Sequence, residues 1–277
     1  MKTFSQRIAQ FCSSHGLKLN RDLGQHFLID DEALAGIVEA AGIQPEDHVV
    51  EIGPGIGILT RELLKCAKHV TTIELDSKLI PLLNKYLSSN EQPFDKTQSR
   101  QANELTILHG NALTTPLPEH PCIIVANIPY HITSPLLRHI FLESSVRPRS
   151  LTLLIQREVA EKICDTEHRG ILTILVSLFG APHLMFTVPP QSFLPPPKVD
   201  SAVLHIECFA EPIADRETID RIFSLTKIAF GQKRKMLRNS IGTLERGMAM
   251  LKRVGIDPER RPETLTVEEW VKLAEER

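Results

Sequence analysis

Asn127, Pro129 and Tyr130 stand together in the run Asn-Ile-Pro-Tyr, directly after the apolar stretch CIIVA. The side-chain carbonyl of Asn127 and the backbone carbonyl of Pro129 can each accept one hydrogen of an amine. An amine with a delocalised lone pair, such as that of adenine, would be drawn toward tetrahedral geometry and made nucleophilic. The ring of Tyr130 can stack on a splayed base, and Phe193 in QSFLPPP is the candidate for the opposite face. An ordinary turn is the alternative interpretation.

A glycine-rich turn follows the run HVVEI and contains Gly53, Gly55 and Gly57. Glycines at such a turn let a ligand approach the backbone closely. The third glycine follows the second by two residues, so the spacing GxGxxG of dinucleotide-binding proteins fails. A nicotinamide cofactor is therefore disfavoured, and a sharp connection without a ligand remains the alternative.

Two polar residues follow the next predicted strands. Glu74 ends the strand TTIE, where its carboxylate can hold the two ribose hydroxyls of an adenosine, a position that suits S-adenosylmethionine. Asn111 follows the run LTILHG, at the carboxyl edge of the predicted sheet, where ligands of such folds bind. Its amide can contact the adenine edge of the cofactor. A solvated charge at a strand end is the alternative for Glu74.

Two further segments have a functional and a plain interpretation. The run GQHFLID at 24–30 can close over the cofactor with His26 and Leu28 facing it, or it can simply cap the following helix at Asp30 or Asp31. A basic run at 227–240 is either a solvated helix face or a surface that follows RNA phosphates. Its basic residues are Lys227, Lys233, Arg234, Lys235 and Arg238.

The elements that position these residues alternate along the chain. From about residue 47 to 126, short β-branched runs alternate with helix-like stretches, which predicts a parallel sheet with helices on both faces. The polar stretch at 88–104 is expected to be an exposed insertion. Strands are predicted at 150–156, 183–188 and 202–208, and helices at 158–164 and 171–180. Only amphipathic helices are predicted after Glu211, so we expect domains at 1–210 and 211–277.

Composition narrows the class of protein further. The net charge is −2, so any attraction to nucleic acid must be local. No apolar stretch is long enough for a bilayer, and the first residues lack a secretory signal, so we expect a cytoplasmic protein. The five cysteines form no CxxC pair and the eleven histidines show no zinc-site spacing. Reduced thiols and no metal are therefore expected.

These motifs together resemble the bacterial family of small-subunit ribosomal RNA adenine dimethyltransferases called KsgA or RsmA. The resemblance is nearly full length. It is carried by GQHFL at 24–28, EIGPGIGILT at 51–60, IELD at 73–76, NIPYHITSPLL at 127–137, QREVAEKI at 156–163, FLPPPKVDSAVL at 193–204 and FGQKRKMLRNSI at 230–241.

The resemblance implies a Rossmann-like α/β methyltransferase domain, with the segment 1–30 closing over its site, and a small helical C-terminal domain that contacts RNA. It implies S-adenosylmethionine as methyl donor and two adjacent adenosines in the 3′-terminal hairpin of 16S ribosomal RNA as substrate, within a small ribosomal subunit or its precursor. A monomer is expected. The implied cofactor contacts are His26, Leu28, Gly53, Gly55, Glu74, Asn111 and Asn127, and the implied target-base residues are Asn127, Pro129, Tyr130 and Phe193.

The chain departs from the common pattern of that family at two positions. Asn111 stands where many relatives have aspartate, and His26 replaces a frequent asparagine. Two alternatives remain open. One is a methyltransferase of the antibiotic-resistance type that acts on large-subunit RNA. The other is a non-catalytic RNA-binding assembly or transcription factor with the same fold.

Overall fold

The computed structural model describes residues 3–17, 25–88, 104–231 and 235–276 of the 277-residue chain. Residues 89–103 of the predicted insertion lie outside the described residues, as do Gly24, Lys233 and Arg234. The expectations that concern them stay predictions.

A seven-stranded sheet forms the centre of the fold, with the strand order β4-β3-β2-β5-β6-β9-β7. The strands from β4 to β6 are parallel, and β9 runs antiparallel to β6. This mixed sheet confirms the predicted α/β fold class. The strands are β2 (His48–Ile52), β3 (His69–Glu74), β4 (Glu104–His109), β5 (Ile123–Asn127), β6 (Ser150–Gln156), β7 (Gly180–Val188) and β9 (Ser201–Cys208).

The depth at which each strand is buried explains how apolar its side chains are. The inner strand β5 is buried from Ile123 to Ala126, and β6 is buried from Ser150 to Ile155, so both need apolar side chains on both faces. Strand β4 lies at the edge of the sheet and is largely exposed, which agrees with its polar and apolar residues in alternation. The predicted strand runs and the observed strands agree to within a few residues.

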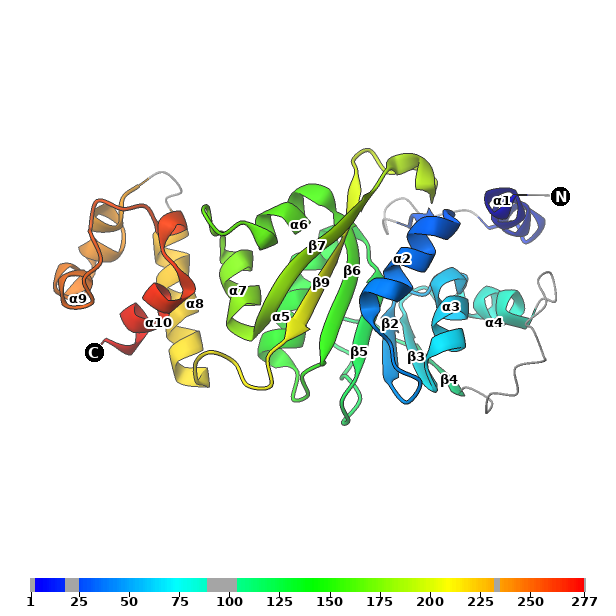
Figure 1. Ribbon diagram of the computed structural model, residues 1–277, viewed down its shortest axis with the longest axis horizontal. Helices are drawn as coiled ribbons and strands as arrows, with labels where there is room; N and C mark the ends of the chain where they lie inside the picture. The colour runs from blue at the N-terminus through cyan, green and yellow to red at the C-terminus, as the bar shows by residue number, and fades with distance from the viewer. Residues whose placement is uncertain (1–2, 18–24, 89–103, 232–234, 277) are drawn as a thin grey trace. The chain divides into compact units, whose positions relative to one another are not determined.

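Helices cover both faces of this sheet in the first part of the chain, with α2 in front of the strands and α5 behind them (Figure 1). Helix α2 begins where the Asp30 carboxylate accepts the backbone N–H groups of Glu32 and Ala33, both at 3.1 Å. It ends at Gly42, whose φ of 57° is left-handed. The helices of this part are α1 (Phe4–Ser14), α2 (Asp31–Ala41), α3 (Ile58–Cys66), α4 (Ile80–Ser88) and α5 (Thr133–Arg138).

A two-stranded ribbon ties the N-terminal part of the chain to a loop near residue 193. Strand β1 (Phe27–Leu28) pairs antiparallel with β8 (Phe193–Leu194). The backbone N–H of Ile29 also donates to the carbonyl of Ser192 at 2.8 Å. The segment just before α2 is therefore held by the proline-rich loop, which is far away from it in the sequence.

The chain divides into two compact units, of residues 1–160 with 183–208 and of residues 161–182 with 209–277. The expected division at 210 therefore differs in one stretch, because 161–182, which includes the end of α6 (Arg157–Cys164), belongs with the C-terminal unit. Helix α7 (Ile171–Phe179) explains the difference, since it is apolar almost all round and contacts α8 (Arg216–Phe230) and α10 (Val267–Glu275). As predicted, the described elements after Glu211 are helical, including α9 (Gly247–Arg253).

Candidate active site

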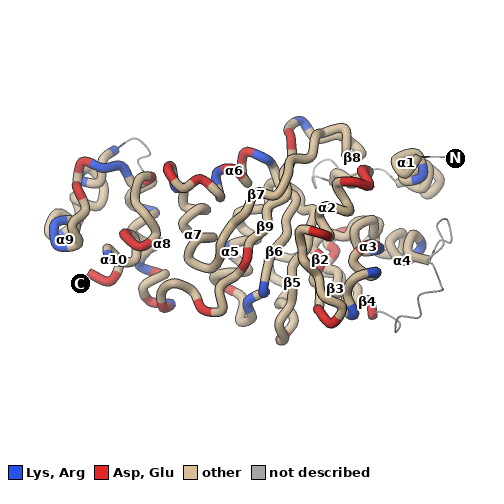
Figure 2. Tube along the Cα trace, viewed as in Figure 1, with Lys and Arg blue, Asp and Glu red and all other residues tan. Residues whose placement is uncertain are grey.

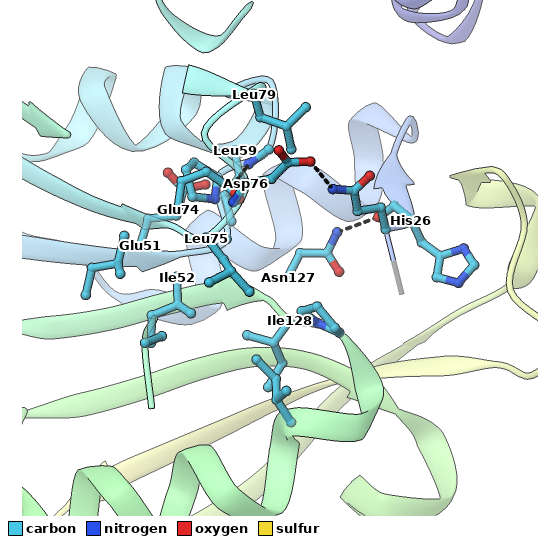
Figure 3. Close-up of a pocket in the computed structure, with 18 of the residues that line it drawn as sticks. His26, Glu51, Ile52, Leu59, Glu74, Leu75, Asp76, Leu79, Asn127 and Ile128 are labelled. Atoms are coloured by element: carbon cyan, nitrogen blue, oxygen red, sulfur yellow. Dashed lines mark hydrogen bonds between the residues drawn. The ribbon is translucent and has the colours of Figure 1, made fainter. Parts of the chain in front are cut away.

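A pocket opens at the carboxyl ends of four parallel strands in the first unit. Its walls come from the segments that follow β2, β3, β4 and β5, together with residues 25–28 (Figure 3). Strand β2 has β3 on one side and β5 on the other, so the chain order reverses there. Such a reversal leaves a crevice in which open α/β sheets bind ligands.

The glycine-rich turn after β2 lines this pocket. Gly53 and Gly55 have φ angles of 68° and 60°, in the left-handed region that favours glycine. A Cβ atom on Gly53 would meet only the Asn127 carbonyl, 3.9 Å away, so the space beside Gly53 is open. A Cβ atom on Gly55 would lie 2.7 Å from the Phe27 ring. The turn thus presents bare backbone to a ligand, and the expected placement of Gly53 and Gly55 in one pocket is observed.

Glu74 lies at the end of β3 and its carboxylate is fixed by the backbone. Its Oε2 accepts the N–H of Gly55 at 3.0 Å, and its Oε1 accepts the N–H of Asp76 at 2.8 Å. Burial raises the pKa of Glu74, while these two hydrogen bonds oppose the rise. Each oxygen keeps a lone pair that can accept a further hydrogen bond, so a vicinal diol is a ligand that this carboxylate can hold.

Glu51 is a second carboxyl group in the pocket wall, and it was not among the residues predicted from the sequence. It lies inside β2 and is only 1% exposed, and its Oε2 accepts the Thr60 hydroxyl at 2.5 Å. Burial raises the pKa of Glu51 to about 8; the Thr60 hydroxyl opposes this rise and the nearby Glu74 adds to it. A carboxyl group inside an otherwise apolar strand was the signal in the sequence, because buried acids are rare without a function.

Asn127 is oriented by a contact with the N-terminal segment. Its amide nitrogen donates to the backbone carbonyl of His26 at 3.0 Å (Figure 3). A carbonyl can only accept, so the nitrogen must face His26 and the amide oxygen Oδ1 must face elsewhere. That oxygen is the acceptor which the Asn-Ile-Pro-Tyr motif predicts for the amine of a base.

Pro129 and Tyr130 follow in the same loop and line the same pocket. The Pro129 carbonyl accepts the N–H of Ile132 at 3.1 Å, which leaves its second lone pair for another donor. The Tyr130 hydroxyl is hydrogen-bonded to the Ser201 hydroxyl at 2.6 Å, which fixes the position of the outer end of the ring. Burial raises the pKa of Tyr130, which keeps the phenol neutral.

Three other predicted cofactor contacts line the pocket in different ways. Leu28 is 4% exposed and forms apolar wall. The Asn111 side-chain oxygen accepts the N–H of Leu113 at 3.0 Å, so its NH₂ group is left for a ligand. The imidazole of His26 points away from Glu74 (Figure 3), and its Nδ1 donates to the Pro195 carbonyl at 2.7 Å.

Phe193, the candidate for the second face of a base, is buried next to the pocket segment 27–28. It is 2% exposed, belongs to the hydrophobic core with Phe27 and Leu28, and is not among the residues that line the pocket. Its pairing with Leu28 across the β1–β8 ribbon explains this position. The predicted role of Phe193 at the target base stays a prediction.

The predicted RNA-contacting residues that the structure describes belong to the C-terminal unit. Lys227 and Lys235 are exposed, whereas Arg238 forms an ion pair of 2.9 Å with Glu259. Basic and acidic residues are mixed in this unit: the last turn of α9 is basic and the first turn of α10 is acidic (Figure 2). Lys233 and Arg234 lie outside the described residues.

Metal-binding clusters and membrane-spanning helices are both absent from the described part of the chain. There, no group of three or more histidine, cysteine or acidic residues is arranged to hold a metal ion. In the same residues, no helix is both long enough and apolar enough to cross a bilayer.

Known proteins resemble this chain over most of its length. Ribosomal RNA small subunit methyltransferase A of Clostridium botulinum (strain Langeland) is 38% identical, covering 96% of each chain. The protein of the same description from Dehalococcoides mccartyi (strain CBDB1) is 39% identical, covering 95% of this chain and 90% of the relative.

Two solved structures are similar in fold. A dimethyladenosine transferase from Plasmodium falciparum has a TM-score of 0.71 at 27% identity, covering 88% of this chain and 94% of its own. The 23S rRNA methyltransferase ErmE has a TM-score of 0.68 at 28% identity, covering 90% of this chain and 98% of its own. A profile of the family described as "Ribosomal RNA adenine dimethylase" matches residues 16–277. This chain, in which Asn127 and Pro129 follow β5 and Glu74 lines the same pocket, belongs to the ribosomal RNA adenine dimethylase family.

Proposed function

We propose that this protein transfers methyl groups from S-adenosylmethionine to the exocyclic amines of two adjacent adenosines in the 3′-terminal hairpin of 16S ribosomal RNA. Each adenosine receives two methyl groups. The observation that carries the proposal is in the loop after β5. There the Asn127 amide nitrogen donates to the His26 carbonyl, so Asn127 Oδ1 is oriented away from His26 and can accept a hydrogen bond from an amine. Pro129 supplies a second acceptor in the same pocket wall.

The residues of the pocket fit S-adenosylmethionine by their chemistry. Glu74 can accept from both ribose hydroxyls, the bare backbone at Gly53 admits a ligand, and the NH₂ group of Asn111 can donate to an adenine nitrogen. Burial disfavours the charged form of the Glu51 carboxyl. A cationic group, such as the α-ammonium of the methionine part of the cofactor, would stabilise that charged form. When bound, the cofactor supplies an electrophilic methyl group on a sulfonium.

The protein residues prepare the nucleophile. Asn127 Oδ1 and the Pro129 carbonyl each accept one hydrogen of the adenine amine, so the nitrogen lone pair leaves the ring system and points out of its plane. Tyr130 holds the base by stacking, and its hydrogen bond to Ser201 fixes the position of the hydroxyl end of the ring. Holding both reactants in line reduces the entropic part of the barrier. The lone pair attacks the methyl carbon while the S–C bond breaks, and the cationic nitrogen then loses a proton to water, so the site needs no strong base.

The choice of small-subunit RNA is supported by the curated relatives, whose names specify the small subunit at 38% identity, against 28% for the large-subunit enzyme ErmE. We further propose that the substrate is a small ribosomal subunit or its precursor, that the protein acts as a monomer, and that it works in the cytoplasm.

Mass spectrometry of small-subunit RNA tests the proposal. Cells that lack this protein should lack dimethyladenosine near the 3′ end, and expression of the wild-type chain should restore it. Expression of Asn127→Ala should not restore it. Dimethyladenosine that persists at that site in the deletion strain would reject the proposed substrate.

A second experiment separates the alternatives that the sequence left open. Isolated small subunits and large subunits from the deletion strain are incubated with radiolabelled cofactor and the protein. Label in the large-subunit RNA would favour the antibiotic-resistance type. Association with subunits without any label would favour a non-catalytic binding factor.

A further inference from the structure

Ser192 is a buried residue whose hydroxyl reaches a segment far away in the sequence. It is 4% exposed, and its Oγ donates to Asp30 Oδ2 at 2.6 Å. Neither Ser192 nor Asp30 is among the residues that line the pocket. Any effect of their hydrogen bond on methyl transfer must therefore pass through other residues.

The Asp30 carboxylate connects the loop of Ser192 to the start of α2. Its Oδ1 accepts the backbone N–H groups of Glu32 and Ala33, whereas its Oδ2 accepts the Ser192 hydroxyl. Partial burial acts to raise the pKa of Asp30, but these hydrogen bonds outweigh burial, so the pKa lies below its ordinary value. The carboxylate is thus ionised at neutral pH, and a hydrogen bond to an ionised acceptor is about twice as strong as one between neutral groups.

The loop that contains β8 holds the segment that contains β1 at both ends of that segment. At one end, Ser192 binds the Asp30 carboxylate and accepts the N–H of Ile29 with its own carbonyl at 2.8 Å. At the other end, the Pro195 carbonyl accepts Nδ1–H of His26 at 2.7 Å. The position of the segment before α2 is therefore set by this loop.

The backbone of His26 transmits that position to Asn127. Its carbonyl accepts the Asn127 amide nitrogen at 3.0 Å (Figure 3). Nitrogen and Oδ1 belong to one planar amide, so the place of the His26 carbonyl determines where Oδ1 points. A shift of this carbonyl would move the acceptor, and a misplacement of about 1 Å in a reacting group can lower a rate about a hundredfold.

We propose that Ser192 and Asp30 are positioning residues for methyl transfer, which act by holding the His26 carbonyl where it orients Asn127 Oδ1. The inference rests on the proposed function and adds two residues to it. The Glu74 carboxylate follows β3 and has no part in this set of hydrogen bonds. A loss of rate without a matching loss of cofactor affinity is therefore the result that we expect when the set is broken.

Three variants and one control test the hydrogen bond between the two residues. Ser192→Ala removes the hydroxyl and leaves the cap of α2 intact. Asp30→Asn removes the charge and keeps the cap, since asparagine and aspartate cap helices about equally well. The third variant combines both changes. The control is Thr173→Val in the C-terminal unit, because Thr173 is also 4% exposed and its hydroxyl donates to the Lys162 carbonyl at 2.6 Å.

We expect Ser192→Ala to lower kcat for methyl transfer to isolated small subunits by about tenfold or more. The cofactor Kd, measured by calorimetry, should change by less than about threefold, because the lost alignment matters in the transition state. Asp30→Asn should lose less, and the double variant should lose no more than Ser192→Ala, because both changes act on one bond. Thr173→Val should keep kcat within about twofold, although it also loses a buried hydrogen bond and its thermal midpoint falls.

A spectroscopic readout tests the orientation of Asn127 directly. The side-chain NH₂ signals of Asn127 in a nitrogen–proton correlation spectrum are assigned by their loss in Asn127→Ala. They should shift in Ser192→Ala and in Asp30→Asn, because the hydrogen bond to His26 is altered. They should stay in place in Thr173→Val. This measurement requires no RNA.

Four results would overturn the inference. The first is an unchanged kcat with unchanged Asn127 signals in Ser192→Ala. The second is a rise of the cofactor Kd that parallels the loss of rate, which would make the loop a support of the cofactor site. The third is additive losses in the double variant, which would show that Ser192 and Asp30 act separately. The fourth is an equal loss of kcat in Thr173→Val, which would indicate general destabilisation.

Two provisions keep the outcome decisive. Should Ser192→Ala not fold, Asp30→Asn decides alone, by its kcat and its Asn127 signals. A wild-type protein that labels no subunit would reject the proposed function, whereas the spectrum would still report whether Asn127 depends on Ser192. The two failures are therefore distinguishable.

Discussion

Asn127 and Glu74 lie in one pocket and are expected to serve different ligands. Asn127→Ala removes an acceptor that matters when the amine becomes nucleophilic, so methyl transfer should fall by roughly a hundredfold or more. Its cofactor Kd should change much less. Glu74→Ala removes a carboxylate held by Gly55 and Asp76, so its main effect should be on the cofactor Kd. Calorimetry and methyl incorporation measure the two effects.

Asn84 provides a matched control for these substitutions. It is an exposed asparagine on α4 whose side-chain amide donates to the Ile80 carbonyl at 3.2 Å, one turn earlier in the same helix. Asn84→Ala should leave both measurements unchanged. Equal losses of cofactor affinity in Asn127→Ala and Glu74→Ala would contradict the division of roles.

Glu51 makes the stability of the fold depend on pH. Its pKa is about 8 when folded against 4.5 for an ordinary glutamate, so between these values the folded chain keeps a proton that the unfolded chain has lost. The free energy of unfolding must then fall as pH rises through this window, by at most about 1.4 kcal/mol per pH unit. Glu51→Gln removes the titration, because the amide stays neutral.

Denaturant unfolding at pH 5, 6, 7 and 8 checks this expectation. The stability of Glu51→Gln relative to wild type should increase with pH, by a few kcal/mol in total. All other titrating groups are shared by the two proteins and cancel in the difference. Parallel curves for the two proteins would show that Glu51 is ionised in the folded state.

The turn between β2 and α3 depends on the absence of a side chain at Gly55. Gly55→Ala should be destabilising for two reasons, because φ is 60° and the new Cβ would lie 2.7 Å from the Phe27 ring. The left-handed conformation alone costs about 1–2 kcal/mol. Displacement of Phe27 would also disturb β1 and the pocket wall, so cofactor affinity should fall as well.

Gly42 at the end of α2 is the matched control for Gly55. Its φ is 57°, yet a Cβ atom there would meet nothing within 4 Å. Gly42→Ala should therefore show the conformational cost of about 1–2 kcal/mol and no loss of cofactor affinity. Equal destabilisation of the two variants, measured by denaturant unfolding, would show that the Phe27 clash is relieved at no cost.

For the molecule as a whole, the net charge of −2 leaves any attraction to RNA to local groups. Lys227→Gln with Lys235→Gln should weaken binding to a 16S hairpin and reduce the slope of log K against log salt, by about one unit for each phosphate that no longer has a basic partner. Arg238→Gln should change the slope less, because Glu259 already neutralises Arg238. Filter binding at several salt concentrations measures these slopes, and unchanged slopes would identify the basic residues as ordinary surface.

The sequence by itself determined the strand and helix rhythm, the carboxyl-edge location of the pocket and nine of its lining residues. It could do so because Gly53, Glu74, Asn111 and Asn127 each lie at or just after the end of a strand of a parallel sheet, and such strand ends meet at one edge. Local pattern was sufficient for these residues.

Only the tertiary structure decided the rest, since it depends on contacts between distant segments. The pairing of β1 with β8 buries Phe193 and places the His26 imidazole beside Tyr130, although these two residues are far apart in the sequence. The packing of α7 against α8 and α10 moves 161–182 into the C-terminal unit. The raised pKa of Glu51 arises from burial, which is a property of the folded neighbourhood and not of the residue type.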